Sequence, residues 1–186
     1  MTFDLRFSIR HLAEATSTNT LARDYAAQGA EEGLVLVADF QSEGRGKPGR
    51  SWVSPPGKNL LFSVLLRPPI SASQAPILTQ IGCRAVANVL NTKYGFACSF
   101  KKPNDILVDG KKICGVLVES ASDPSGNLDS VVVGIGLNIN AQGNQLPPEA
   151  TSMRELQGKE FDKKRILGEI LDDLTQNIKW LYDHSA

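Results

Sequence analysis

The stretch ILVDGKKICGVLVE, residues 106–119, decides the fold class. Two apolar runs of strand length flank Asp109-Gly110, a dipeptide that forms tight turns because glycine takes a positive φ without strain. The stretch therefore predicts a β-hairpin in the middle of the chain.

Further runs of strand length surround this hairpin. The segments 34–40 and 59–67 are apolar, 97–101 is a shorter candidate, and turn residues at 123–127 lead into another apolar run over 131–139. Hairpins concentrated in the middle favour antiparallel pairing over a repeating βαβ pattern. We expect an α+β fold with a mixed, largely antiparallel sheet flanked by helices.

Three helices are predicted around the sheet. Polar caps at 16–19 precede a helical pattern that ends at Gly29. A second apolar stripe begins after Ser73 and Pro76 and stops at Gly95, and a third occupies 167–181. These amphipathic patterns predict helices that each bury one face.

Composition excludes several classes of protein. The chain has 186 residues, the size of one domain, and its 20 Lys and Arg balance 20 Asp and Glu. Zero formal charge gives no signal for coating nucleic acid or an anionic membrane. No apolar run reaches the ~20 residues of a membrane span, and the start lacks the pattern of a secretory signal, which favours the cytoplasm.

The reactive residue types are few. Cys83, Cys98 and Cys114 lie far apart in the sequence, so we expect three reduced, mostly buried thiols. Only His11 and His184 are available, which disfavours a histidine base or a histidine-rich metal site. Catalysis therefore has to come from other groups.

The most informative pattern is the glycine-rich basic loop QSEGRGKPGRSW at 41–52. Its glycines formally satisfy the dinucleotide fingerprint G-x-G-x-x-G, and residues 44–51 come within one residue of a Walker A loop, whose lysine is Arg50 here. The segment 53–57 that follows, however, cannot continue the helix that a dinucleotide fingerprint must open. The loop still carries three cations on a flexible, glycine-rich backbone, which suits it to bind a phosphate or another small anion. These cations are Arg45, Lys47 and Arg50. Trp52 beside them has the shape to cover a nucleobase. A solvated basic turn and a core tryptophan are the plain alternatives.

Seven short segments together are similar to those of a known family. GRGKPGRSW at 44–52 is followed by SPPGKNL at 54–60, and STN stands at 17–19. KKPND at 101–105 precedes KKICGVLVE at 111–119, and GIGLNIN and ATSMREL occupy 134–140 and 150–156. In type and order these blocks resemble the biotin protein ligases. The resemblance implies the class II aminoacyl-tRNA synthetase-like catalytic fold of biotin and lipoyl ligases.

The resemblance also implies a reaction. Biotin and Mg-ATP give biotinyl-5′-AMP and pyrophosphate, and biotin then passes to a lysine of a biotin carboxyl carrier domain, such as that of acetyl-CoA carboxylase. A carboxylate that attacks a polyphosphate needs cations more than an acid or base. The implied catalytic residues are Lys112, Arg45, Lys47 and Arg50, with Lys112 on the biotin carboxylate and α-phosphate. A solvent-exposed hairpin lysine is the alternative, which fits Lys111 better.

Substrate contacts follow from the same resemblance. The implied biotin site is Ser17, Thr18, Asn19, Gln41, Gly44, Arg45, Lys112 and Gly115, where hydroxyl and amide groups match the ureido ring. The implied nucleotide site is Arg45, Lys47, Arg50, Trp52, Asn59, Asn104 and Asn138, with Trp52 on adenine. Asp105 is implied as an organiser of Mg²⁺ or of Lys112. The plain alternatives are helix caps, turn residues and sheet glycines.

Two positions depart from the family pattern. Lys47 stands where the family usually has Arg, and a lysine lacks the planar two-pronged phosphate contact, so we expect looser retention of the intermediate. Lys102 replaces the usual Trp and puts a charge in place of an apolar wall.

We interpret residues 1–186 as a single catalytic domain. Only ~16 residues precede the first block, too few for the N-terminal helix-turn-helix of some relatives, and the C-terminal β-barrel common in the family is not expected. The expected partners are biotin, ATP and the carrier protein, without nucleic acid or membrane, and a homodimer is left open.

Two other functions stay open. One is a lipoyl or octanoyl transferase, against which the biotin-type pattern at 45–57 argues. The other is a non-catalytic anion-binding module. Lys112 separates that module from an enzyme, because Lys112→Ala should leave pure binding intact but lower adenylation by at least ~100-fold.

Overall fold

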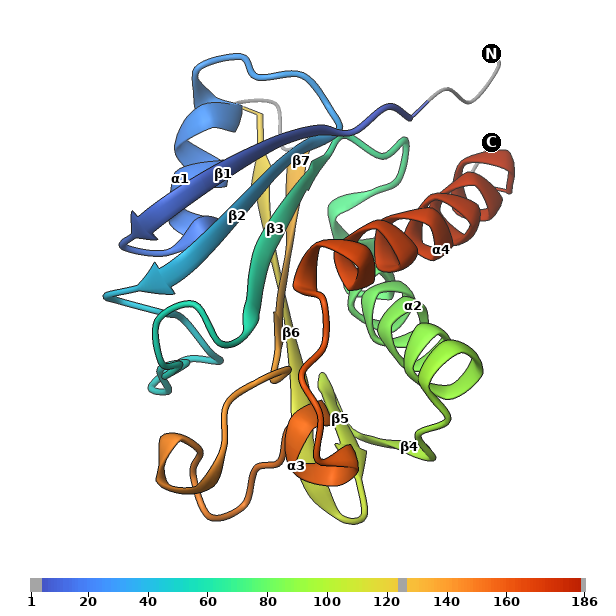
Figure 1. The fold of residues 1–186 in the computed structure, drawn as a ribbon. Coiled ribbons are helices and arrows are strands. Elements are labelled where there is room, and N and C mark those ends of the chain that lie inside the picture. Colours follow the sequence, from blue (N-terminus) through green and yellow to red (C-terminus); the bar gives the residue numbers. More distant parts are fainter. Residues whose placement is uncertain (1–4, 124–126, 185–186) are drawn as a thin grey trace.

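The sheet is the organising element of the fold. The computed structural model describes residues 5–123 and 127–184, and in them seven strands form one sheet with helices on both faces (Figure 1). The strands are β1 (Ser8–Ala15), β2 (Leu34–Gln41), β3 (Leu60–Leu66), β4 (Cys98–Lys101), β5 (Asp105–Val108), β6 (Lys111–Ser122) and β7 (Leu128–Leu137). Their order across the sheet is β1-β2-β3-β7-β6-β5-β4, and only β1 and β2 run parallel. The predicted mixed, largely antiparallel sheet is confirmed.

Helices cover the two faces unequally. α1 (Thr18–Ala27) packs Ala22 and Ala26 on one face, against Leu36 and Leu65. α2 (Ile77–Tyr94) and α4 (Lys163–Asp183) lie side by side on the other face and enclose the larger core (Figure 1). Every residue of β3 is buried because both faces of this central strand are covered.

The short elements complete the chain. They are η1 (Ala72–Gln74), η2 (Gly143–Gln145) and α3 (Met153–Gln157). No helix in the described part of the chain has both the length and the apolarity that crossing a membrane requires.

The helix ends follow the predicted chemistry. Ser17 caps α1, its hydroxyl lying 3.5 Å from the amide nitrogen of Thr20. Gly95 ends α2 in the left-handed conformation, with φ of 72°. Asp162 caps α4 by accepting hydrogen bonds from two amides in its first turn, so that this helix begins before the predicted residue 167.

The central hairpin is also confirmed. Asp109 and Gly110 turn the chain with φ of 50° and 75°, and β5 and β6 pair antiparallel on either side. At the predicted turn 123–127, the amide of Asp123 donates to the carbonyl of Asn127 at 2.8 Å, while residues 124–126 lie outside the described residues.

Candidate active site

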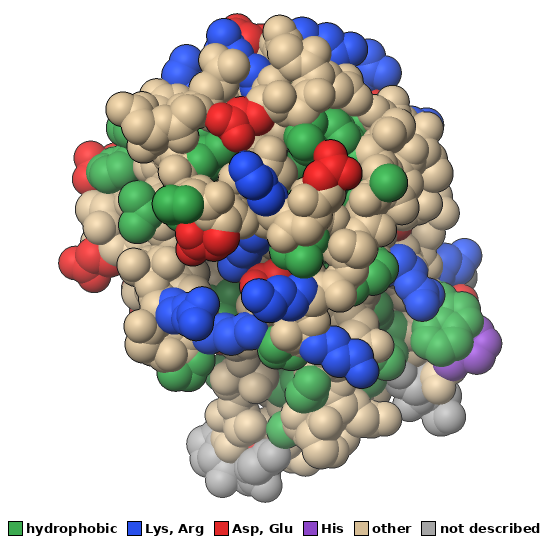
Figure 2. Space-filling model, turned by 90° about the horizontal axis from the view of Figure 1, so that it is seen from below, with side chains coloured by type: hydrophobic (Ala, Val, Ile, Leu, Met, Phe, Trp, Pro, Cys, Tyr) green, Lys and Arg blue, Asp and Glu red, His purple; other side chains and the backbone are tan. Residues whose placement is uncertain are grey.

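A cavity of about 500 Å³ opens beside the basic loop and the β5–β6 hairpin. Its lining includes every predicted site residue except Gly44 and Asn59, drawn from segments between Ser17 and Asn138. Lys and Arg side chains gather on the end of the molecule that carries the hairpin (Figure 2). The structure therefore brings together residues that are far apart in the sequence.

A polar pocket forms one part of the cavity, and we define it by Ser17, Thr18, Asn19 and Gln41, with Ser63 buried behind them. Gln41 Oε1 accepts from the Thr18 amide at 2.7 Å and from its hydroxyl at 3.1 Å. Ser63 Oγ lies 2.7 Å from Thr18 Oγ1 and 2.6 Å from Asn19 Oδ1. The N-terminus of α1 thus supplies both a helix cap and a set of hydroxyl and amide groups, so the two interpretations of Ser17 and Thr18 are compatible.

Gly134 makes space for this pocket. A Cβ atom at Gly134 would lie 2.0 Å from Asn19 Oδ1, so the Asn19 side chain can cross β7 only over a glycine.

The basic loop is folded back on itself by its backbone. The amide of Gly46 donates to the Arg50 carbonyl at 3.0 Å, and the Arg50 amide donates to the Lys47 carbonyl at 2.8 Å. The Trp52 amide donates to the Gly44 carbonyl at 2.8 Å. A Cβ at Gly44 would lie 2.2 Å from the Trp52 carbonyl oxygen, so Gly44 closes the base of the loop and stays outside the cavity lining.

Trp52 lies on the sheet beneath the loop. A Cβ at Gly136 would come within 2.6–3.0 Å of its ring, and one at Gly115 would lie 3.0 Å from it. These glycines make room for an indole ring, which gives Gly115 a packing role in addition to its place in the lining. Trp52 Nε1 is buried without a hydrogen-bond partner among the described residues.

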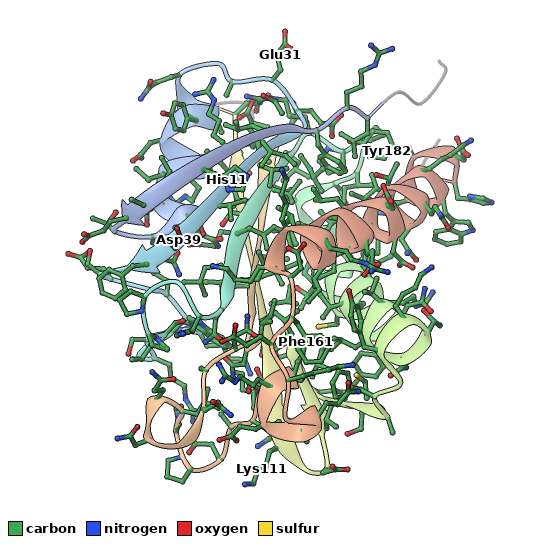
Figure 3. The ribbon with its side chains drawn as sticks, in the orientation of Figure 1. His11, Glu31, Asp39, Lys111, Phe161 and Tyr182 are labelled. Atoms are coloured by element: carbon green, nitrogen blue, oxygen red, sulfur yellow. The ribbon has the colours of Figure 1, made fainter. Side chains whose placement is uncertain are left out.

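Both the side chain and the backbone of Lys112 are held by neighbouring residues. Its ammonium lies 2.8 Å from Asp105 Oδ1 and 5.2 Å from the centre of the Trp52 ring. Its backbone amide donates to the Glu149 carbonyl and its carbonyl accepts from the Thr151 amide, both at 2.9 Å. Lys111, by contrast, lies at the hairpin end of the molecule, where its side chain points outward and is exposed (Figure 3). Asp105 was expected to organise either Mg²⁺ or Lys112, and the structure shows its contact with Lys112.

The three asparagines differ in position. Asn104 donates to the Val116 carbonyl at 2.7 Å and leaves its buried Oδ1 without a partner among the described residues. Asn138 lines the cavity and donates to the Thr151 carbonyl at 3.1 Å. Asn59 is 1% exposed and bonds Ser54, Asn138 and the Ile139 amide, so it lies behind the lining and joins the segment after the basic loop to the residues that follow β7.

Two residues that contact the cavity lining from behind were not singled out from the sequence. Ser63 is the one polar side chain of β3, and that isolated position in an apolar strand was a usable signal. Glu119 ends the block at 111–119 and forms an ion pair with Arg45, with Nη1 and Oε1 at 3.0 Å.

The cysteines and histidines lie outside the lining. The three thiols are free, with Cys83 and Cys114 buried and Cys98 half-buried. Burial raises the pKa of Cys83 and of Cys98 to about 11, and raises that of Cys114 well above its ordinary value. His11 and His184 are exposed, and the described residues contain no group of three or more His, Cys, Asp or Glu placed to hold a metal ion.

With this geometry in view, comparison with known proteins defines the class. The model of the biotin/lipoate A/B protein ligase family matches residues 12–138, and the chain belongs to that family. Among curated relatives, the bifunctional ligase/repressor BirA of Bacillus subtilis is 37% identical over 160 residues, 84% of this chain and 49% of the relative. The biotin--[acetyl-CoA-carboxylase] ligase of Mycobacterium tuberculosis is 33% identical over 175 residues, 90% of this chain and 62% of the relative. The chain therefore spans about half of the first relative and less than two thirds of the second.

A solved structure gives the same result for the fold. The biotin protein ligase of Aquifex aeolicus in complex with biotin and ATP matches with a TM-score of 0.79 and 32% identity, covering 95% of this chain and 72% of that one. The predicted class II aminoacyl-tRNA synthetase-like catalytic fold is confirmed by this likeness.

Proposed function

We propose that this chain is the catalytic domain of an ATP-dependent biotin protein ligase. The enzyme joins biotin to ATP, giving biotinyl-5′-AMP and pyrophosphate, and transfers the biotinyl group to a specific lysine of a biotin carboxyl carrier domain. The observation that carries the proposal is one cavity in which Arg45, Arg50 and Lys112 meet beside the polar pocket. The relatives named as biotin ligases support the same choice of substrate.

The first step needs little acid–base chemistry. A carboxylate oxygen of biotin attacks the α-phosphorus of ATP, and the bond from that phosphorus to the bridging oxygen of the leaving pyrophosphate breaks. Two anions must approach each other, and fixed cations lower that barrier electrostatically. Lys112 is such a cation because Asp105 anchors its ammonium at 2.8 Å. Arg45 and Arg50 cover the phosphates from the loop side.

Polar groups in the cavity suit the two substrates. The polar pocket offers hydroxyl and amide groups to the ureido ring of biotin, which carries both donors and an acceptor. Trp52 Nε1 and Asn104 Oδ1 are a buried donor and a buried acceptor that a nucleotide can satisfy. Asn138 adds a polar side chain from β7.

ATP enters as its Mg²⁺ complex. Asp105 and Glu149 are the carboxylates in the cavity lining, and Mg²⁺ commonly takes one or two protein carboxylates with the remaining oxygens from phosphate and water. The residues present therefore fit an ion that arrives with its nucleotide, whose charge helps to neutralise the phosphates.

The second step transfers the acyl group. The neutral amine of the carrier lysine attacks the acyl carbon, the bond from that carbon to the phosphate oxygen breaks, AMP leaves, and the nitrogen loses a proton to water. Until then the mixed anhydride needs protection from hydrolysis. The basic loop, closed over the cavity, provides that shelter.

Intact mass measurement of the carrier tests the proposal. The protein is incubated with biotin, Mg-ATP and a biotin carboxyl carrier domain, with Lys112→Ala and an ATP-free reaction as controls. We expect a biotin-sized mass gain that requires ATP and is lost in the variant. No gain from active reagents would overturn the proposal. Parallel reactions with lipoate or octanoate and a lipoyl domain should give no product, and a product there would favour the lipoyl alternative.

A further inference from the structure

Glu119 of β6 lies between two parts of the site that approach it from different elements. Its side chain is 16% exposed. Oε2 accepts a hydrogen bond from Asn19 Nδ2 of the polar pocket at 2.9 Å. Oε1 lies 3.0 Å from Arg45 Nη1 of the basic loop. One carboxylate therefore connects the polar pocket to the basic loop.

The bond to Asn19 extends through the pocket. Asn19 Nδ2 also donates to the Leu117 carbonyl at 3.2 Å, and Asn19 Oδ1 lies 2.6 Å from Ser63 Oγ. Ser63 in turn contacts Thr18, which bonds Gln41. Because its oxygen and nitrogen are both engaged, the Asn19 amide has one orientation, which Glu119 helps to fix.

The ion pair restrains a side chain that has few other anchors. Arg45 belongs to a glycine-rich loop, and its side chain is 43% exposed. An exposed ion pair contributes little to stability, but Glu119 is mostly buried, and besides its ion pair with Arg45 it accepts hydrogen bonds from Arg23 on Oε1 and from Asn19 on Oε2. The main effect of Glu119 is thus to hold the Arg45 guanidinium at the cavity, and its effect on the stability of the fold is secondary.

Arg23 of α1 provides a comparison within the same cluster. Its Nη1 lies 3.3 Å from Glu119 Oε1, the oxygen that also meets Arg45. Arg23 is absent from the cavity lining. Arg23 can neutralise the charge of Glu119 without positioning any group at the site. Its replacement therefore separates the effect of losing a positive charge near Glu119 from the effect of losing the position of Arg45.

We propose that Glu119 is a positioning residue for adenylation, which holds Arg45 at the cavity while orienting Asn19 in the polar pocket. The inference rests on the proposed ligase function and deepens it. Glu119 acts through these two partners and does not touch the substrates.

A substitution that separates the two contacts tests this role. Glu119→Gln keeps an oxygen for Asn19 but loses the charge that holds Arg45. We expect biotinyl-5′-AMP to leave this variant about 10-fold faster, with KM for biotin within about 2-fold of wild type. Glu119→Ala removes both contacts, and its KM for biotin should rise about 10-fold as well. Arg23→Gln, the matched control, should change neither value by more than about 2-fold.

A double-mutant cycle tests whether Glu119 acts through Arg45. In an Arg45→Gln background, Glu119→Gln should give no further acceleration of intermediate release. Additive effects, or equal effects of Glu119→Gln and Arg23→Gln in the parent protein, would overturn the assignment.

Limited trypsin digestion gives a readout that needs no enzymatic activity. Trypsin cuts after Arg45 and Arg50, whereas Pro48 blocks the bond after Lys47, and fragment masses identify cuts at these two sites. Without substrates, Glu119→Gln should be cut there at least about 5-fold faster than wild type or Arg23→Gln, at unchanged melting temperature. If the protein failed to ligate biotin, this digestion would still report on the loop. Equal rates of cutting in wild type, Glu119→Gln and Arg23→Gln would contradict the positioning role of Glu119 and leave the ligase proposal intact.

Discussion

Lys112 and Asp105 face each other across the β5–β6 hairpin, with 2.8 Å between the ammonium and carboxylate Oδ1. The register places Asp105 opposite Gly115 and Lys112 opposite Leu107, with an irregularity between Ile106 and Leu107. This local shift accompanies a diagonal contact between two side chains that are not direct partners. A flexible lysine is thereby held at the cavity, next to a neighbour, Lys111, that is free in solvent.

The contrast between the two lysines gives the first prediction. Lys112→Ala should lower the rate of adenylation by at least about 100-fold, because it removes a cation from the transition state. Lys111→Ala should keep the rate within about 2-fold, since that side chain is exposed at the start of β6. Pyrophosphate release from biotin and ATP measures both. Similar rates for the two variants would contradict the role given to Lys112.

A second prediction concerns Lys47, which lines the cavity from the basic loop. Lys47→Arg should slow the escape of biotinyl-5′-AMP, because a guanidinium binds phosphate through two parallel hydrogen bonds. The rate is measured by trapping released intermediate after a single turnover. If biotinyl-5′-AMP escaped from Lys47→Arg at the wild-type rate, the lack of a planar guanidinium contact at position 47 would not explain the loose retention of the intermediate.

A third prediction uses the space beneath Trp52. Gly136→Ala should displace the indole, since the new Cβ would lie 2.6 Å from Trp52 Cε2. In a Trp180→Phe background, the fluorescence of Trp52 should shift to longer wavelength, and KM for ATP should rise about 10-fold.

Gly168→Ala in α4 is the matched control for that experiment. Nothing lies within 4 Å of its Cβ position, so it should leave the fluorescence unchanged and stabilise the protein by up to about 1 kcal/mol. An unshifted spectrum for Gly136→Ala would show that the ring does not pack there.

The buried thiols give a prediction for pH. Burial raises the pKa of Cys83 and Cys98 from 9.0 to about 11, so the folded protein keeps protons that the unfolded chain loses. Stability should therefore fall as pH rises from about 9 towards 11, in addition to any effect of other groups. Urea unfolding across this range measures the fall, and triple Cys→Ala substitution should reduce it.

Reactivity provides the complementary measurement. At pH 8 the folded protein should react slowly with an aromatic disulfide reagent, because the thiolate is the nucleophile and little of it is present. Unfolding should expose three rapidly reacting thiols. Rapid reaction of all three in the folded state would contradict their burial.

The fold was predictable where apolar periodicity and turn chemistry agree. The Asp109-Gly110 hairpin, the buried strand β3 and the helix ending at Gly95 all carry local signals of this kind. β1 was missed because it is a mostly exposed edge strand without a clear apolar alternation. α3 was missed because its five residues are too short to show a helical period.

The site was predictable as a set of residues and less so in its internal contacts. Motif resemblance identified Lys112 and Arg45, but the bond from Arg45 to Glu119 depends on how the loop returns over β6. Asn59 shows the same limit. Its motif position suggested a ligand contact, whereas its 1% exposure and hydrogen bonds to Ser54 and Asn138 place it behind the cavity lining.

The glycine at 134 has a consequence for protein engineering. Asn19 can lie across β7 only because residue 134 has no side chain, and Ser63 contacts Asn19 from the centre of β3. The polar groups that would determine specificity for biotin are therefore packed against the hydrophobic core. Redesign for a bulkier or less polar acid would have to repack the middle of the sheet at the same time. Broadened substrate range and a lower melting temperature should consequently emerge together in any library built at these positions.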